Sequence, residues 1–139
     1  MSSNWPKEIE DLETFLRNEG FECERREYPK MFGNKILQCK AGGVAVQAVS
    51  DRGVWSVYVA DIEGRPGHWY FVSTLRDLIV GSGKEVLSLA EQVDLIKANW
   101  AAIVANFSPE SREETHSRLE ALGKERARRM FPRLYSKRK

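Results

Sequence analysis

An amphipathic pattern in the second half of the chain is the clearest structural signal. Apolar residues recur there in steps of four and three, which is typical of one buried helix face. Ser88 and Glu91 form a capping box that predicts the start of this helix, and Ser108-Pro109 predicts its end and the start of a last helix to about Met130. The positions of the stripe are Leu89, Val93, Ile96, Trp100, Ile103 and Phe107.

A shorter stripe of the same kind predicts a helix at the N-terminal end. Ser3 or Asn4 is suited to cap it, Pro6 suits its first turn, and Gly20 suits its end. We expect this stripe to pack on the core as well. Its members are Trp5, Ile9, Leu12, Phe15 and Leu16.

The segment between these helices alternates in the way strands do. A tight turn, Asp51-Arg52-Gly53, separates two of the strands and places Gly53 where positive φ is needed. Thr74 and Asp77 resemble a capping box and predict a short helix that ends near Gly81. The predicted strands are 21–28 (an edge strand), 35–40, 44–50, 54–62 and, as a possible fifth, 68–72.

The order of helix, strands and helices predicts an α+β fold. We expect an antiparallel sheet of about four or five strands, with the N-terminal helix and two longer C-terminal helices packed on one face. The length of 139 residues fits one domain, predicted over residues 1–131, followed by a basic tail over 132–139. From Gly123 onward there are eight Lys and Arg against one acid, whereas the net charge of the chain is only +2. The body is therefore acidic and the end basic.

Two cysteines and the character of the N-terminus suggest a compartment. Cys23 and Cys39 form no Cys-x-x-Cys motif, and the N-terminus does not resemble a secretory signal. Apolar runs such as 54–62 are far too short to span a membrane. We therefore expect two reduced thiols in a cytoplasmic protein without membrane contact.

No motif in the chain indicates catalysis. His68 and His116 are far apart, so we expect no metal site, and Gly81-Ser82-Gly83-Lys84 lacks the spacing of a phosphate loop. No nucleophile signature is present. We assign no catalytic residue and expect no cofactor.

The overall layout resembles that of small bacterial immunity proteins that accompany polymorphic toxins. The resemblance lies in the acidic first helix, the short meander in which Ser50-Asp51-Arg52-Gly53 leads into Val54-Trp55, and the helix pair from Ser88. It covers most of the chain at the level of layout, and no functional residue is carried over from it. It implies a binding protein that inhibits a protein partner.

Three functional hypotheses follow from these patterns. The first is a non-catalytic module of immunity or inhibitor type that meets a protein partner, possibly a basic one, with an acidic surface and an anchoring loop. Its predicted partner-binding residues are Glu8, Glu10, Asp11, Glu13, Asp61, Glu63, Arg65, His68 and Trp69.

The second hypothesis is a nucleic-acid-associated or regulatory protein that uses the basic end of the chain. The third is a small-ligand binder or an enzyme with a pocket between sheet and helices. The residues that would contact nucleic acid are Arg126, Arg128, Arg129, Arg133, Lys137, Arg138 and Lys139.

Overall fold

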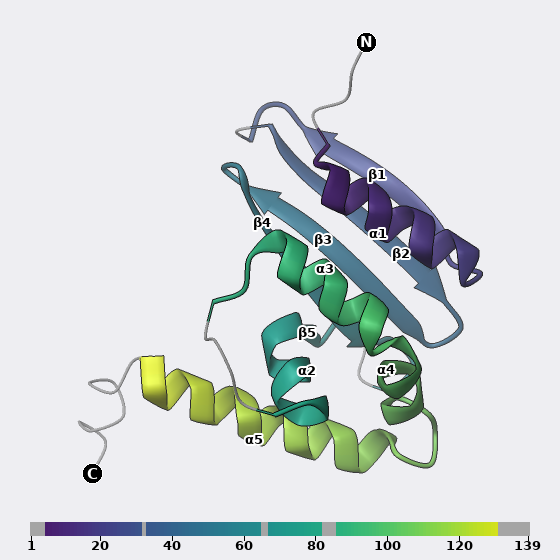
Figure 1. The fold of residues 1–139 in the computed structure, drawn as a ribbon, viewed down its shortest axis with the longest axis vertical. Coiled ribbons are helices and arrows are strands. Elements are labelled where there is room, and N and C mark those ends of the chain that lie inside the picture. Colours follow the sequence, from purple (N-terminus) through teal and green to yellow (C-terminus); the bar gives the residue numbers. More distant parts are fainter. Residues whose placement is uncertain (1–4, 32, 65–66, 82–85, 131–139) are drawn as a thin grey trace.

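A five-stranded antiparallel sheet forms the centre of the structure, a computed structural model that describes residues 5–31, 33–64, 67–81 and 86–130. The strands follow one another in sequence order across the sheet, so that each pairs with its neighbour in the chain (Figure 1). The predicted α+β architecture is confirmed. The strands are β1 (Glu22–Tyr28), β2 (Asn34–Ala41), β3 (Val44–Asp51), β4 (Val54–Asp61) and β5 (Trp69–Phe71).

The β3–β4 hairpin turns through two residues with left-handed backbone. Asp51 pairs with Val54, which leaves Arg52 at φ 54° and Gly53 at φ 87° in the loop. A two-residue hairpin of this mirror-image type needs positive φ at both positions, so the prediction for Gly53 is confirmed. Arg52 adopts this left-handed conformation although it is not glycine. Its backbone N–H donates a hydrogen bond to Asn34 Oδ1 at 2.9 Å.

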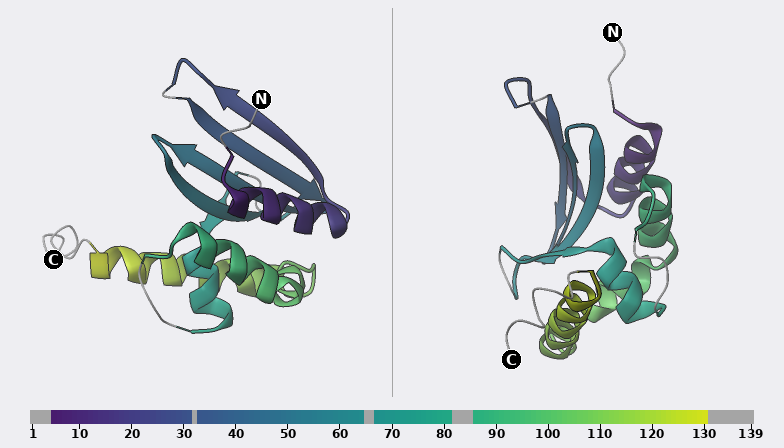
Figure 2. Two further views of the ribbon diagram at one scale, coloured as in Figure 1. Left: turned by 45° about the horizontal axis from the view of Figure 1, so that its top comes forward. Right: turned by 90° about the vertical axis from the view of Figure 1, so that its left-hand side faces the viewer.

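The helices lie on one side of the sheet and beyond its β5 edge. α1 and α3 pack against the sheet, whereas α2 and α5 lie beyond β5, as the right-hand view of Figure 2 shows. The described helices are α1 (Lys7–Asn18), α2 (Val72–Ile79), α3 (Leu89–Ala98), α4 (Trp100–Asn106) and α5 (Arg112–Met130).

The long apolar stripe is not one helix, as the sequence predicted, but two. The chain breaks at Asn99, which has φ −117° and ψ 22° and donates from its side-chain amide to the Leu95 carbonyl at 3.0 Å. Asparagine competes with helical backbone bonds in this way, and the break lets the stripe follow the core around a corner. The predicted capping box is confirmed, since Ser88 Oγ accepts from the Glu91 N–H at 3.1 Å and Glu91 Oε1 from the Ser88 N–H at 2.8 Å.

Three other helix starts differ from the prediction. α1 begins at Lys7 behind Pro6, and Ser3 and Asn4 lie outside the described residues. α2 begins at Val72, so Thr74 is inside the helix and does not cap it. α5 begins at Arg112, three residues after Pro109, because residues 108–111 form turns first.

The core lies between one face of the sheet and the helices. Alternate residues of β2, β3 and β4 point into it, and their side chains are almost wholly inaccessible to solvent. The helical contribution comes from both stripes that the sequence predicted. The most deeply buried apolar residues include Ile9, Leu12, Leu16, Leu37, Val46, Val57, Val59, Leu75, Ile96, Ile103 and Leu119.

A disulfide joins Cys23 to Cys39, so the prediction of two reduced thiols is wrong. The β1–β2 register places the two residues directly opposite each other, with Cα atoms 4.0 Å apart, which the sequence separation of 16 alone did not reveal. The expectation of a cytoplasmic protein thereby loses one of its two supports. In the described part of the chain, no helix has the length and apolarity that crossing a membrane requires.

Reducing this disulfide should lower the free energy of unfolding by about 3 kcal/mol, because the bridge restricts the unfolded chain over a loop of this length. Urea denaturation with and without a phosphine reductant measures the change. The double variant Cys23→Ala/Cys39→Ala is the control, and its stability should not respond to the reductant. Mass spectrometry after alkylation should show neither cysteine labelled in the untreated protein; two labelled thiols would contradict the bridge.

Candidate functional site

A buried chain of polar groups ties α5 to the ends of β4 and β5. Asp61 and His116 are wholly inaccessible to solvent, and His116 Nε2 lies 3.0 Å from Asp61 Oδ2. The other ring nitrogen, Nδ1, lies 2.6 Å from the Tyr70 hydroxyl. Because an ionised carboxylate only accepts, Nε2 donates to Asp61, and the Tyr70 hydroxyl is the hydrogen-bond partner of Nδ1.

The carboxylate of Asp61 also contacts two groups that are not part of the Asp61–His116–Tyr70 series. The Gly64 N–H donates to its Oδ1 at 2.9 Å, and Arg112 Nε lies 2.8 Å from its Oδ2. Burial by itself raises the pKa of Asp61, but the hydrogen bonds from Gly64 and His116 and the charge of Arg112 outweigh it and hold the pKa below its usual range. Asp61 is therefore a buried anion with a full set of partners.

Gly64 occupies a position that admits no side chain. A Cβ atom there would collide with the Asp61 carboxylate and with the Arg112 side chain. The tight turn after β4 therefore requires glycine for a close approach and not for its backbone angle. This requirement makes the turn part of the buried network.

The order of carboxylate, imidazole and hydroxyl matches the arrangement that activates nucleophiles in enzymes. Here the imidazole and the carboxylate have no exposed surface, and none of these three residues lines a cavity found among the described residues. The network therefore ties α5 to the ends of β4 and β5.

The structure moves two of the predicted partner-binding acids into the interior. Asp61 is one, and its predicted place on an acidic surface is wrong. Glu13 is the other: its two carboxylate oxygens lie 2.8 Å from Arg17 and 2.7 Å from Arg25, and only 11% of its side chain is exposed. Burial raises the pKa of Glu13, but the hydrogen bonds from Arg17 and Arg25 lower it further than burial raises it. Both acids are occupied within the fold.

The remaining predicted residues do not form one surface. Glu10 and Asp11 are exposed and Glu8 is half-buried on α1, which covers the helix side of the sheet. Trp69 pairs with Ala60 and lies on the opposite side. The predicted acidic helix and the predicted anchor are therefore separated by the sheet.

The other predicted residues, Glu63, Arg65 and His68, belong to the connection between β4 and β5. His68 is exposed, and Glu63 is largely exposed with its carboxylate 3.3 Å from Arg112. Arg65 lies outside the described residues.

The basic residues of α5 have acidic neighbours. Arg126 and Arg129 each come within 3.9 Å of Asp77, and Arg128 lies 3.8 Å from Glu125. Four other predicted contacts to nucleic acid lie outside the described residues: Arg133, Lys137, Arg138 and Lys139. The same holds for the whole predicted tail over 132–139.

One face of the sheet has no helix against it. In the right-hand view of Figure 2, the described helices leave the far side of β1–β4 uncovered. Strand register aligns the outward side chains in rows across this side. We call it the open sheet face and define it by Arg26, Ile36, Gln38, Gln47, Val49, Ser56, Tyr58, Trp69 and Phe71.

The middle of the open sheet face is apolar, aromatic and free of charge. Ile36 pairs with Val49, and Tyr58 pairs with Phe71, their rings 4.9 Å apart. Phe71 is 52% exposed although it is large and apolar. Charge on this face is concentrated on β1, where Arg26 forms an ion pair with Glu24.

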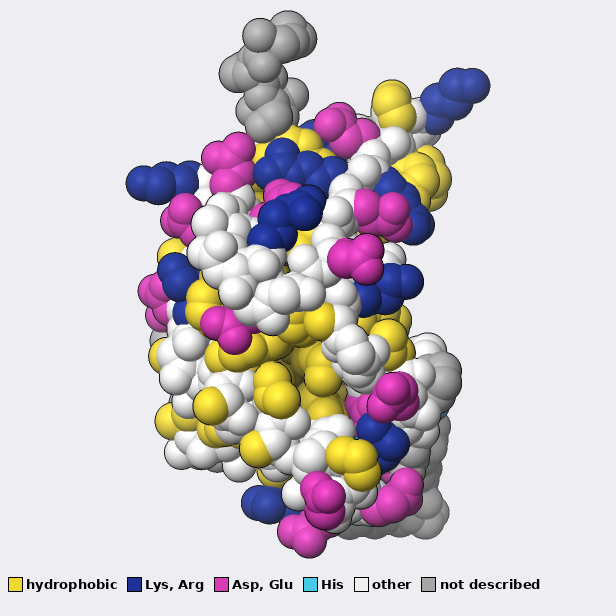
Figure 3. Space-filling view, turned by 90° about the vertical axis from the view of Figure 1, so that its right-hand side faces the viewer, with side chains coloured by type: hydrophobic (Ala, Val, Ile, Leu, Met, Phe, Trp, Pro, Cys, Tyr) yellow, Lys and Arg dark blue, Asp and Glu magenta, His cyan; other side chains and the backbone are white. Residues whose placement is uncertain are grey.

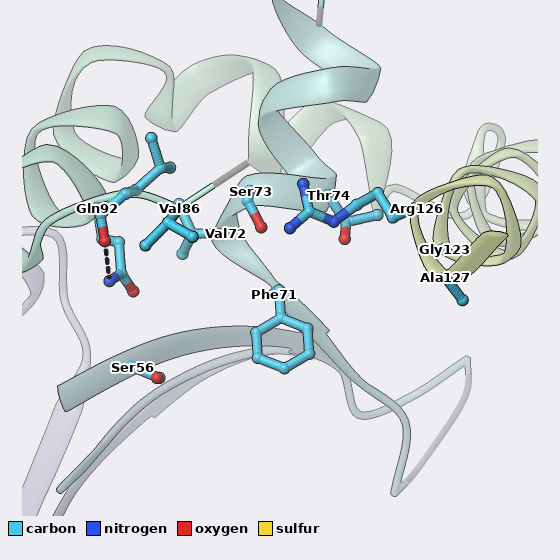
Figure 4. A pocket seen from close by; sticks show the side chains of 11 residues that line it. Ser56, Phe71, Val72, Ser73, Thr74, Val86, Gln92, Gly123, Arg126 and Ala127 are labelled. Atoms are coloured by element: carbon cyan, nitrogen blue, oxygen red, sulfur yellow. Dashed lines mark hydrogen bonds between the residues drawn. The ribbon is translucent and has the colours of Figure 1, made fainter. Parts of the chain in front are cut away.

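Two hollows open on the described surface, and the first is lined in part by Ser56 and Phe71 of the open sheet face. The first, of about 500 Å³, lies between α2, α5 and the edge of β4 (Figure 4). The second, of about 540 Å³, lies where α1 and α4 meet the β2–β3 turn, and Figure 3 shows hydrophobic side chains around it. Among the described residues, no cluster of His, Cys, Asp or Glu has the composition of a metal site.

Comparison with known proteins adds no relative: no family model, no curated protein and no solved structure matches this chain.

Sequence reasoning missed His116 and Tyr70 as partners of Asp61. One signal was present in β4, where Asp61 continues the alternation of Val57 and Val59 and so falls on the buried face. An acid in such a position needs a buried partner. Which residue supplies it depends on the packing of α5, 55 residues further along the chain.

Asp61→Asn should lower the free energy of unfolding by about 3–5 kcal/mol, the usual cost of removing one member of a buried charged pair. Glu63→Gln is the matched control, because Glu63 contacts the same Arg112 from the surface. This substitution should lower the free energy of unfolding by less than about 1 kcal/mol. Urea denaturation at pH 7 measures both. Equal effects of the two variants would contradict the structural role of Asp61.

The stabilising effect of Asp61 should also depend on pH. A carboxyl whose pKa is lowered by folding stabilises above its unfolded pKa of about 4 and loses this effect as the pH falls through the folded value. The difference in the free energy of unfolding between the wild type and Asp61→Asn should therefore become smaller as the pH is lowered from 5 toward 2. Fluorescence-detected denaturation measures this difference. A difference that stays constant down to pH 2, or grows, would contradict the lowered pKa.

Proposed function

We propose that this chain is a non-catalytic protein-binding module that meets its partner through the open sheet face. One observation carries the proposal: none of the described helices lies against this face, and yet it presents large apolar and aromatic side chains around an uncharged centre. A solvated face of an antiparallel sheet ordinarily carries polar residues at its outward positions. Here Ile36, Val49, Tyr58 and Phe71 occupy them.

The chemistry of this face is that of the central part of protein interfaces. Such regions are poor in charge and rich in aromatic residues, with a polar rim around them. Gln38 and Gln47 are directly paired in the middle row and offer amide hydrogen bonds, while Glu24 and Arg26 form a charged rim on β1. Tyr58 and Trp69 combine a large apolar surface with a polar group, as residues that dominate binding energy do.

The inhibitor type of binding remains part of the proposal. The resemblance in layout to immunity proteins motivates it. A basic partner would be attracted by the exposed acids Glu10 and Asp11 at longer range. These residues steer the approach in this account, and the open sheet face makes the contact.

A capture experiment with two matched variants tests the proposal. Val49→Arg places a charge in the centre of the open sheet face, and the double variant Glu10→Lys/Asp11→Lys changes charge on the helix side. Tagged wild type should retain a specific protein from the native host. Val49→Arg should reduce the equilibrium affinity by about 100-fold or more, because a buried unpaired charge is costly, while the α1 variant should mainly slow association in low salt.

Both variants should keep the melting temperature and circular dichroism of the wild type. An unchanged affinity of Val49→Arg for a partner that the α1 variant no longer binds would place the interface on the helix side. Failure of the native host to supply any protein that binds the wild type would contradict the protein-binding function itself.

A further inference from the structure

β1 is the outermost strand of the sheet at the end opposite β5 (Figure 1). Among the described residues, only β2 forms a ladder with it, and five of its seven residues are exposed. The outer side of such a strand carries backbone N–H and C=O groups that no other strand of the sheet pairs, and a strand of another chain can pair with them. The edge of β1 is therefore a candidate interaction surface.

The contact between β1 and β2 identifies which backbone groups point outward. Cys23 and Cys39 are directly opposite each other with Cα atoms 4.0 Å apart, a short separation typical of a pair that exchanges no backbone hydrogen bonds. The N–H and C=O of Cys23 therefore point away from β2, and the carbonyl accepts from Arg17 Nη2 at 2.9 Å. Because hydrogen bonding alternates along an antiparallel strand, Arg25 and Glu27 direct their backbone groups outward as well.

These outward groups match those of a second copy of the same strand. Two β1 strands that run antiparallel with Arg25 opposite Arg25 also place Cys23 of each copy opposite Glu27 of the other. Every outward N–H and C=O then meets a complementary group across the new ladder. A shift of the register by one residue would place outward groups opposite inward ones and form no such ladder.

The charges along β1 favour this same register. It places Glu24 of each copy opposite Arg26 of the other, in the positions between the hydrogen-bonded pairs, where side chains come closest. Glu24 and Arg26 already form an ion pair within one chain, with side chains 58% and 51% exposed. In the paired strands these four charges alternate in sign, so that each one lies between two opposite charges.

Other registers with the same hydrogen-bonding pattern bring like charges together. A shift of two residues in one direction places Glu24 opposite Glu24, and a shift in the other direction places Arg26 opposite Arg26. The like pair of the favoured register, Arg25 with Arg25, is compensated within each chain. Its guanidinium lies 2.7 Å from Glu13 Oε1 and 4.7 Å from the centre of the Trp5 ring.

We propose that this chain forms a symmetric dimer in which two β1 strands pair antiparallel in the register centred on Arg25. Charged side chains generally protect a sheet edge against pairing, but here their order disfavours the shifted registers and favours one. Directly opposed residues point to the same side of a sheet, so the two open sheet faces form one continuous surface in the dimer. The dimer does not rest on partner binding through that face.

Sedimentation velocity of the full chain between about 1 μM and 1 mM tests the dimer, which should be weak because one strand pair buries little surface. Arg26→Glu and Glu24→Arg each place like charges at both 24–26 contacts, and each should weaken self-association at least about ten-fold. An equimolar mixture of these two variants should associate again, since opposite charges then face each other at both contacts. Arg118→Glu on α5, where the side chain is 58% exposed, is the matched control and should dimerise like the wild type.

A wild type that stays monomeric at the highest concentration would overturn the proposal, as would a mixture that associates no better than its separate components. Circular dichroism should show that the variants are folded like the wild type. A dimer that Val49→Arg disrupts and Arg26→Glu leaves intact would place the contact on the open sheet face instead.

Amide hydrogen exchange measured by NMR gives a readout that depends on the register. The N–H groups of Cys23, Arg25 and Glu27 should exchange rapidly in dilute solution and become protected at high concentration. Those of Glu24 and Arg26 face β2 and should be protected at both concentrations. Exchange of the three outward amides that does not change with concentration would contradict pairing through β1.

Discussion

A sheet that is buried on one face only is the constraint on which the rest of this structure depends. α1 and α3 supply the apolar surface that covers β2, β3 and β4 from one side, and the chain has no further described element for the other side. Of the three remaining helices, α2 and α5 lie beyond β5 and extend the core sideways, and α4 packs against α2 and α3. The uncovered side therefore leaves Tyr58, Trp69 and Phe71 at least partly accessible to a partner.

The buried polar network specifies where α5 lies in this extension of the core. α5 carries few apolar residues, and Leu119 is the most deeply buried of them. Its position is fixed instead by His116 and Arg112, which meet Asp61 at the end of β4. α5 also forms one wall of the first hollow, which none of Asp61, Tyr70 and His116 lines.

Local patterns in the sequence were sufficient for the elements but not for their contacts. Alternation in β3 and β4 and the capping box at Ser88 report interactions between neighbours in the chain, and both predictions are confirmed. The disulfide, the break at Asn99 and the burial of Asp61 depend on register and packing over long distances, and the corresponding predictions are wrong for that reason. Glu13 shows the same limit, since it occurs among exposed acids of α1 but turns toward Arg25 of the neighbouring strand.

The predicted anchor Trp69 and the predicted acidic helix are both accessible, but the sheet lies between them. Only the side that contains Trp69 has the composition of an interface centre. Hydroxyl-radical footprinting of the free chain and of its complex with a captured partner tests this most directly. The account predicts that Tyr58, Trp69 and Phe71 are oxidised rapidly in the free chain and become protected in the complex. Unchanged oxidation of these three residues, together with protection confined to α1, would contradict it.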